Sequence, residues 1–259
     1  MSGYILCQTK KADKPFFVES INTNIYSLEE LCYFLYHNLY LVDSSVINEN
    51  LCTWISEELD LPRLAAKLRP HLGKFASAED VLYPVFKEIN YLTYDELKAL
   101  NVKLAKLDQE APLLRKKRKG DALMENRMYV NAIRVYQKLL EKDSREISRE
   151  MRERILHNQG CAYSYLFQMD KALDCFFAAW KVNQSEKALK IYLLAYRSVH
   201  TPEEFEKIQE DLKAEDSVKK ETARALEQFI SLPEQKIAPG ETDRILEDLT
   251  REYHRSTGS

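Results

Sequence analysis

The stretch RILHNQGCAYSYLFQMDKALDCFFAAW, residues 154–180, decides the fold of this chain. Gly160 is followed twelve residues later by Ala172 and sixteen residues later by Phe176. An earlier stretch repeats the same spacing with Gly120, Ala132 and Tyr136. Small residues at the first two positions let helices approach closely, because larger side chains would push the backbones apart, and the aromatic ring fills the space beside them. The spacing therefore predicts two helical hairpins.

Over residues 113–199 the sequence resembles the tetratricopeptide repeat, whose units are pairs of antiparallel helices. Tyr163 and Ala179 extend the match in the second unit, three residues after the glycine and three after the aromatic residue. The two glycines are 40 residues apart instead of the usual spacing of about 34. The additional residues fall in the charged stretch 141–153. The resemblance implies a mainly α-helical protein in which the first helix of each pair lines a groove that receives a peptide.

The resemblance also implies which side chains line this groove. Carried over residue by residue, they are Lys117, Asp121, Met124, Arg154, His157, Asn158, Cys161 and Tyr165. Lys117 and Asn158 match two positions of the clamp by which chaperone-binding members of the family hold a terminal carboxylate. The remaining clamp positions do not match, since they are occupied by Asp121, Ala188 and Tyr192. The resemblance therefore does not favour a chaperone tail as the ligand.

One constellation in the expected groove has the residue types of a reactive site. His157 and Cys161 are four residues apart on one helix, so their side chains share a face. Asp121 occupies in the first hairpin the place that Cys161 occupies in the second. Cys, His and Asp together form some nucleophilic sites, but two ligands do not make a zinc site and no oxyanion donor is apparent. Groove polarity is the favoured interpretation.

Three parts are predicted along the chain: residues 1–110, 111–232 and 233–259. In the first part, short apolar runs at residues 4–8 and 16–19 predict a β-hairpin. Helices are then expected from signals at Ser27 with Glu30, Ser44 or Ser45, Pro62, Ser77 with Asp80, and Thr93 with Glu96. The sequence therefore predicts a β-hairpin followed by helices in residues 1–110.

The second part continues beyond the two clear hairpins. Residues 188–199 with 205–212 are expected to form a degenerate third hairpin, and residues 218–230 to cap the array, because two units rarely bury enough surface alone. The third part contains a short amphipathic helix that includes Ile245, Leu246, Leu249 and Tyr253. That helix is interpreted as part of a mobile tail or as a docking helix.

The middle of the chain is basic, although the net charge is −3. Residues 111–154 contain 13 Lys and Arg against 7 Asp and Glu. The densest run is Arg115, Lys116, Lys117, Arg118 and Lys119. Such a run could meet a phosphate backbone, but charged runs on helices are usually solvated and no aromatic residues interleave to stack on bases. Nucleic-acid binding is therefore an alternative and not the main hypothesis.

Composition and missing motifs exclude several classes of protein. No run approaches the roughly 20 apolar residues that cross a bilayer. Five scattered cysteines without a C-x-x-C pair fit reduced thiols, so we expect a cytoplasmic protein that does not contact a membrane. Nucleotide-binding, zinc-protease, serine-hydrolase and EF-hand motifs are absent from the sequence, so no cofactor or metal is predicted.

The main hypothesis is a non-enzymatic protein–protein interaction module or assembly scaffold that binds a peptide or helix in its groove. The expected partner is another protein or a peptide, and the sequence specifies no oligomeric state. A nucleic-acid-associated regulator that uses residues 115–119 is the first alternative. An unrecognised enzyme in residues 1–110 is the second.

Overall fold

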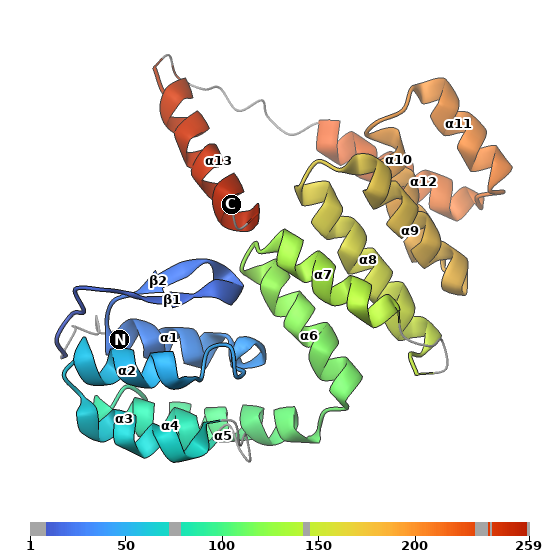
Figure 1. The fold of residues 1–259 in the computed structure, drawn as a ribbon. Coiled ribbons are helices and arrows are strands. Elements are labelled where there is room, and N and C mark those ends of the chain that lie inside the picture. The colour runs from blue at the N-terminus through green and yellow to red at the C-terminus, as the bar shows by residue number, and fades with distance from the viewer. Residues whose placement is uncertain (1–8, 73–78, 142–145, 231–237, 239, 258–259) are drawn as a thin grey trace. The chain divides into compact units, whose positions relative to one another are not determined.

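The chain is mainly α-helical, as predicted, with a small β-hairpin near its amino terminus (Figure 1). The structure, a computed structural model, describes residues 9–72, 79–141, 146–230, 238 and 240–257. The chain divides into two compact units, Met1–Asn126 and Arg127–Ser259. Each unit has its own buried apolar residues, and the two are described separately below.

The hairpin of the first unit pairs β1 (Phe16–Val18) with β2 (Thr23–Ile25) in antiparallel register. A short 3-10 turn joins them and ends at Asn22, whose φ of 46° is in the left-handed region that Asn tolerates. The predicted strand at residues 16–19 is confirmed. The other predicted strand, residues 4–8, lies outside the described residues. The observed partner, β2, has only three residues and a central Asn, so it carries little strand signal.

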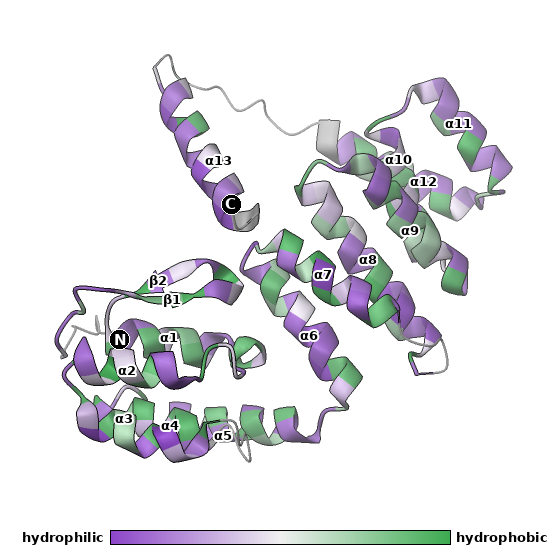
Figure 2. Cartoon of the chain, viewed as in Figure 1, coloured by the Kyte–Doolittle hydropathy of each residue, from purple (hydrophilic) through white to green (hydrophobic). Residues whose placement is uncertain are grey.

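Six α-helices follow in the described part of the first unit. They are α1 (Leu28–His37), α2 (Glu49–Glu57), α3 (Pro62–Leu68), α4 (Glu79–Glu88), α5 (Tyr94–Gln109) and α6 (Pro112–Glu125). Among them, α2 packs on α3, α3 on α4, and α1 on α4. Leucines at helical spacing, such as Leu28, Leu31 and Leu35 of α1, are fully buried. Figure 2 shows hydrophobic and hydrophilic positions alternating around these helices, the pattern that buries one face of each.

Capping residues set several of these helix starts. The Ser27 hydroxyl accepts a hydrogen bond from the backbone N–H of Glu30 at 3.2 Å, and Thr93 and Glu96 form a complete capping box. Both starts were predicted. The predicted start of α2 near residues 44 and 45 is too early, because the Ser45 backbone N–H and hydroxyl donate to Asp43 and close a local turn. Asn48 caps α2 instead, accepting from Leu51 N–H at 3.0 Å.

The second unit consists of seven helices in the part of the chain that is described. They are α7 (Tyr129–Leu140), α8 (Arg149–Tyr165), α9 (Met169–Asn183), α10 (Glu186–Arg197), α11 (Pro202–Asp211), α12 (Asp216–Ile230) and α13 (Thr242–Thr257). Helices that follow one another pack as neighbours from α7 to α11, and α12 packs on α10. This packing in adjacent pairs is compatible with a helical repeat.

Gly160 explains the close packing of α8 on α9. A Cβ atom added at Gly160 would lie 2.6 Å from the ring of Phe176, well inside van der Waals contact. Ala172 is fully buried on the same side of α9. The spacing of glycine, alanine and aromatic residue therefore has the physical basis expected from the sequence. The phenylalanine ring continues into a cluster with Leu189, Tyr192 and Leu193 of α10.

Candidate functional site

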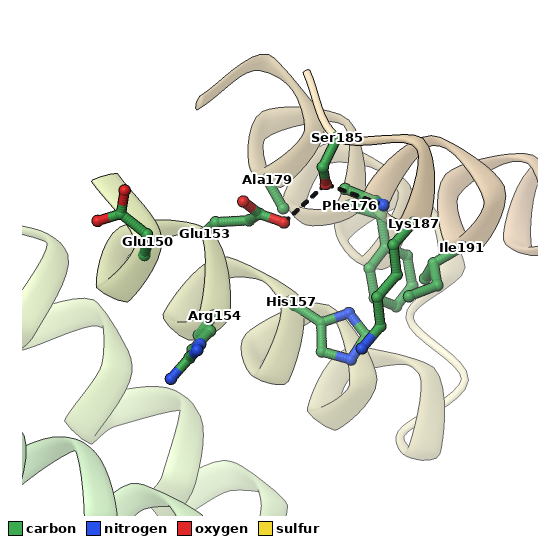
Figure 3. A pocket seen from close by; sticks show the side chains of 10 residues that line it. Glu150, Glu153, Arg154, His157, Phe176, Ala179, Ser185, Lys187 and Ile191 are labelled. Atoms are coloured by element: carbon green, nitrogen blue, oxygen red, sulfur yellow. Dashed lines mark hydrogen bonds between the residues drawn. The ribbon is translucent and has the colours of Figure 1, made fainter. Parts of the chain in front are cut away.

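A pocket of about 350 Å³ opens on the second unit, where α8, α9 and the start of α10 meet (Figure 3). Its walls come from three successive helices of the array. The lining residues are Glu150, Glu153, Arg154, His157, Phe176, Ala179, Ser185, Lys187, Ala188 and Ile191. The first four belong to α8, which is the helix that the sequence assigns to the groove.

The floor of the pocket is apolar and fixed in place. Phe176 is only 5% exposed, and its ring lies 5.8 Å from the His157 ring, centroid to centroid. Ala179 and Ala188 are also buried, while Ile191 is half-buried. Because residue 160 is glycine, the Phe176 ring packs directly against α8, in the space that a Cβ atom would occupy. Such a floor can receive an apolar side chain.

Glu153 connects α8 to the start of α10. Its carboxylate accepts hydrogen bonds from the Ser185 hydroxyl at 2.9 Å and from the Asn183 amide at 2.5 Å. The Ser185 hydroxyl in turn accepts from Ala188 N–H at 3.2 Å and so caps α10. Figure 3 shows both Ser185 bonds at one edge of the pocket. The carboxylate therefore holds two walls together and points toward the cap.

Basic and imidazole side chains surround the rest of the pocket. In Figure 3, Lys187 extends from α10 toward the His157 ring beside Phe176, and Arg154 lies on the same face of α8 one turn earlier. The start of α10 adds the partial positive charge of a helix amino terminus. Glu150 lies away from the floor, and hydrogen bonds to its own backbone N–H and to the Ser148 hydroxyl lower its pKa. The lining therefore combines the carboxylate of Glu153, which Ser185 and Asn183 already engage, with the positive charges of Arg154 and Lys187, which can meet an anionic group.

The structure brings the predicted histidine and cysteine together on α8. Cys161 Sγ lies 3.6 Å from His157 Nε2. Burial raises the pKa of the Cys161 thiol above its ordinary value, so the thiol stays protonated at neutral pH. Asp121 belongs to the other unit, where its carboxylate pairs with Lys117 at 2.6 Å. Among the described residues, no group of three His, Cys, Asp or Glu side chains could hold a metal ion.

The structure divides the predicted groove residues between the two units. Lys117, Asp121 and Met124 are on α6 in the first unit; Arg154, His157, Asn158, Cys161 and Tyr165 are on α8 in the second. Arg154 and His157 line the pocket. Tyr165 is 62% exposed and stacks on Tyr129 with ring centroids 4.6 Å apart. The sequence did not identify Lys187 and Ile191. In the third hairpin the resemblance placed only Ala188 and Tyr192, at clamp positions that do not match, and Ala188 lines the pocket.

The basic run on α6 has partners inside the first unit. Arg115 donates to the Leu107 carbonyl at 2.6 Å. Three ion pairs follow, Lys117 with Asp121 at 2.6 Å, Arg118 with Glu110 at 3.0 Å, and Lys119 with Asp43 at 2.6 Å. Lys116 is exposed. These contacts neutralise much of the positive charge that the sequence shows at residues 115–119.

Comparisons with known proteins add no relative. No family model matches the chain, and searches among curated proteins and among solved structures return no match. Within the described residues, every helix is too short or too polar to cross a lipid bilayer.

Proposed function

We propose that this chain is a non-enzymatic interaction module, resembling tetratricopeptide proteins, that binds a peptide segment or helix of another protein across α8 and α10. The observation that carries the proposal is the pocket between these helices, with Phe176 as its buried floor and Lys187 and His157 beside it. Neighbouring hairpins offer such a surface because each leaves one helix exposed on the same side of the array.

The pocket indicates the kind of segment that fits. Its volume of about 350 Å³ is at the small end of the range for ligand pockets, about 300–1,000 Å³. One large apolar side chain of a partner would fit inside it. Lys187 and Arg154 favour a carboxylate next to that side chain, since charge-assisted hydrogen bonds are stronger than neutral ones. We therefore propose a partner segment with a large apolar residue beside an acidic one.

Several features support a binding role over catalysis. The thiol of Cys161 is protonated at neutral pH, and Glu153 serves the cap of α10. An enzyme in residues 1–110 stays a prediction. Nucleic-acid binding by residues 115–119 is a weaker proposal, because Lys119 and Arg118 already pair with acidic residues. A cytoplasmic location likewise stays a prediction.

Peptides selected from a random display library on the full chain would test the proposed function. Their affinities are then measured by fluorescence anisotropy against Lys187→Glu, with Lys207→Glu on α11 as a matched reversal of an exposed lysine. We expect Lys187→Glu to weaken binding by about tenfold or more and Lys207→Glu to leave it unchanged. Equal affinity of the selected peptides for both variants, with helical content retained, would contradict the proposal.

A further inference from the structure

The last helix, α13, presents apolar side chains to solvent along one stripe. Leu246 is 55% exposed, Leu249 57% and Tyr253 58%. Their spacing of three and four residues places them on one face of the helix. Figure 2 shows the remainder of α13 as predominantly hydrophilic. The stripe, defined as Leu246, Leu249 and Tyr253, is therefore the apolar side of an amphipathic helix.

Among the described residues of the second unit, the contacts that hold α13 lie beside the stripe. α13 packs on α7, and Glu252 forms an ion pair with Arg127 just before that helix. Ile245, about two turns before Glu252 on the same side, is half-buried. The helix is thus held along the edge that contains Ile245 and Glu252. The stripe lies next to this edge and keeps more than half of each side chain in water.

The acidic and basic residues of α13 lie on different faces of the helix. Successive residues of a helix are rotated by about 100°. On this basis Asp243 and Glu247 lie on one side of the stripe. Glu252 and then Asp248 lie on the other side. The three arginines of the helix, Arg244, Arg251 and Arg255, fall on the face opposite the stripe. Arg251 pairs there with Asp248 at 3.3 Å. Asp243 and Glu247 therefore border one side of the stripe, with His254 between them. On the other side, Glu252 and Asp248 are already paired with Arg127 and Arg251.

We propose that the stripe on α13 is a docking surface for an amphipathic helix of another protein whose apolar face is bordered by lysine or arginine. Leu246, Leu249 and Tyr253 follow the spacing of a helix–helix seam, and the flanking carboxylates match basic residues at the seam's edges. A second copy of α13 would bring carboxylate against carboxylate, which is repulsive. A membrane surface prefers helices with basic residues beside the apolar face, which α13 lacks. This surface is separate from the α8–α10 pocket and does not depend on the proposed function.

Two designed peptides serve as probes for this surface. Each has about 21 residues with leucine at the seam positions, and the flanking positions carry lysine in one peptide and glutamate in the other. Like charges keep each peptide from pairing with itself. We expect the full chain to bind the lysine peptide at least about tenfold more tightly than the glutamate peptide in low salt. Added salt should reduce that preference, because exposed charge pairs are screened.

Variants of the exposed side chains connect the binding to the stripe. Leu249→Ser and Tyr253→Ser should each weaken binding of the lysine peptide by about tenfold. Tyr94→Ser, which removes an 82% exposed tyrosine from α5, is the control and should leave binding unchanged. Equal affinity for the two peptides would overturn the proposal. Self-association of the chain that Leu249→Ser abolishes, or binding to anionic phosphatidylserine vesicles that the same variant abolishes, would also overturn it.

Discussion

At residue 160 a side chain of any size has no room. The distance of 2.6 Å between an added Cβ and the Phe176 ring means that Gly160→Ala must displace a buried ring. Overpacking of this kind costs about 1–3 kcal/mol, while alanine returns about 1 kcal/mol of helix propensity. We therefore expect Gly160→Ala to lower the free energy of unfolding by as much as about 2 kcal/mol, measured by urea denaturation.

A second substitution separates this clash from other effects. In Gly160→Ala with Phe176→Leu, the smaller side chain gives the new methyl group its space. The two changes should then cost less together than the sum of their separate costs, which is the signature of residues in contact. Strict additivity would show that the ring is not what excludes a side chain at residue 160.

The reactivity of the Cys161 thiol can be measured directly. Burial raises its pKa above the ordinary value of 9.0, so the folded thiol ionises at higher pH than a free one. Iodoacetamide modification at pH 8, located by peptide mass spectrometry, should be slower at Cys161 than for N-acetylcysteine. Because the pKa of this thiol is higher in the folded chain than in the unfolded chain, the unfolded thiol loses its proton first as the pH rises. The free energy of unfolding that this group contributes is therefore fully present below pH 9 and decreases above it. Fast modification at neutral pH would instead indicate an activated thiolate and reopen the question of catalysis.

At the scale of single elements, sequence signals located helices better than they located the pocket. The Gly160, Ala172 and Phe176 spacing identified α8 and α9 because each residue type answers a local packing demand. Thr93 with Glu96 set the start of α5 for the same reason, since a capping box is a local interaction. Of the pocket lining, Arg154 and His157 were predicted as groove residues, and Ala188 was placed only as a clamp position that does not match. Lys187 and Ile191 were not identified, because the packing of α10 on α9 is a contact between segments that carries no spacing signal.

The hydrogen bond between Glu153 and Ser185 predicts how a substitution at Ser185 affects α10. Ser185→Ala removes the hydroxyl that caps α10 and donates to Glu153. Loss of such a cap costs about 1 kcal/mol, so the urea midpoint should fall and amide exchange in the first turn of α10 should accelerate. Ser198→Ala, at the other end of α10, is the matched control and should change stability by less than about 0.5 kcal/mol.

Glu153→Ala should then add little to Ser185→Ala, because both remove the same connection. Asn183 also donates to Glu153, so a small additional loss is expected from the carboxylate. If the two substitutions destabilise the chain independently, the carboxylate and the cap do not act as one unit, and the pocket wall on α10 is held by other contacts.

At the scale of the whole molecule, α6 belongs with the helices that precede it. It packs on the turn Leu39–Leu41 of the first unit. Lys119 pairs with Asp43, and Asn126 just after the helix donates to the Asn38 side chain at 2.7 Å. Arg118 adds an ion pair with Glu110. These contacts explain why the compact unit ends at Asn126, beyond the end of the part expected from sequence, residues 1–110.

Two amino-terminal fragments test this assignment. Residues 1–126 should melt cooperatively and at a higher temperature than residues 1–110, because the shorter fragment lacks α6 and leaves Asp43 and Asn38 without these contacts. Each surface pair contributes only about 0.2–1 kcal/mol, so most of the difference should come from the apolar side chains that α6 buries, among them Leu123. Lys119→Ala in the longer fragment should therefore lower its melting temperature only slightly, whereas Leu123→Ala should lower it by several degrees. If the fragment of residues 1–110 is as stable as the longer one, α6 folds with the repeat that follows it, and the groove extends across both hairpins as the resemblance implies.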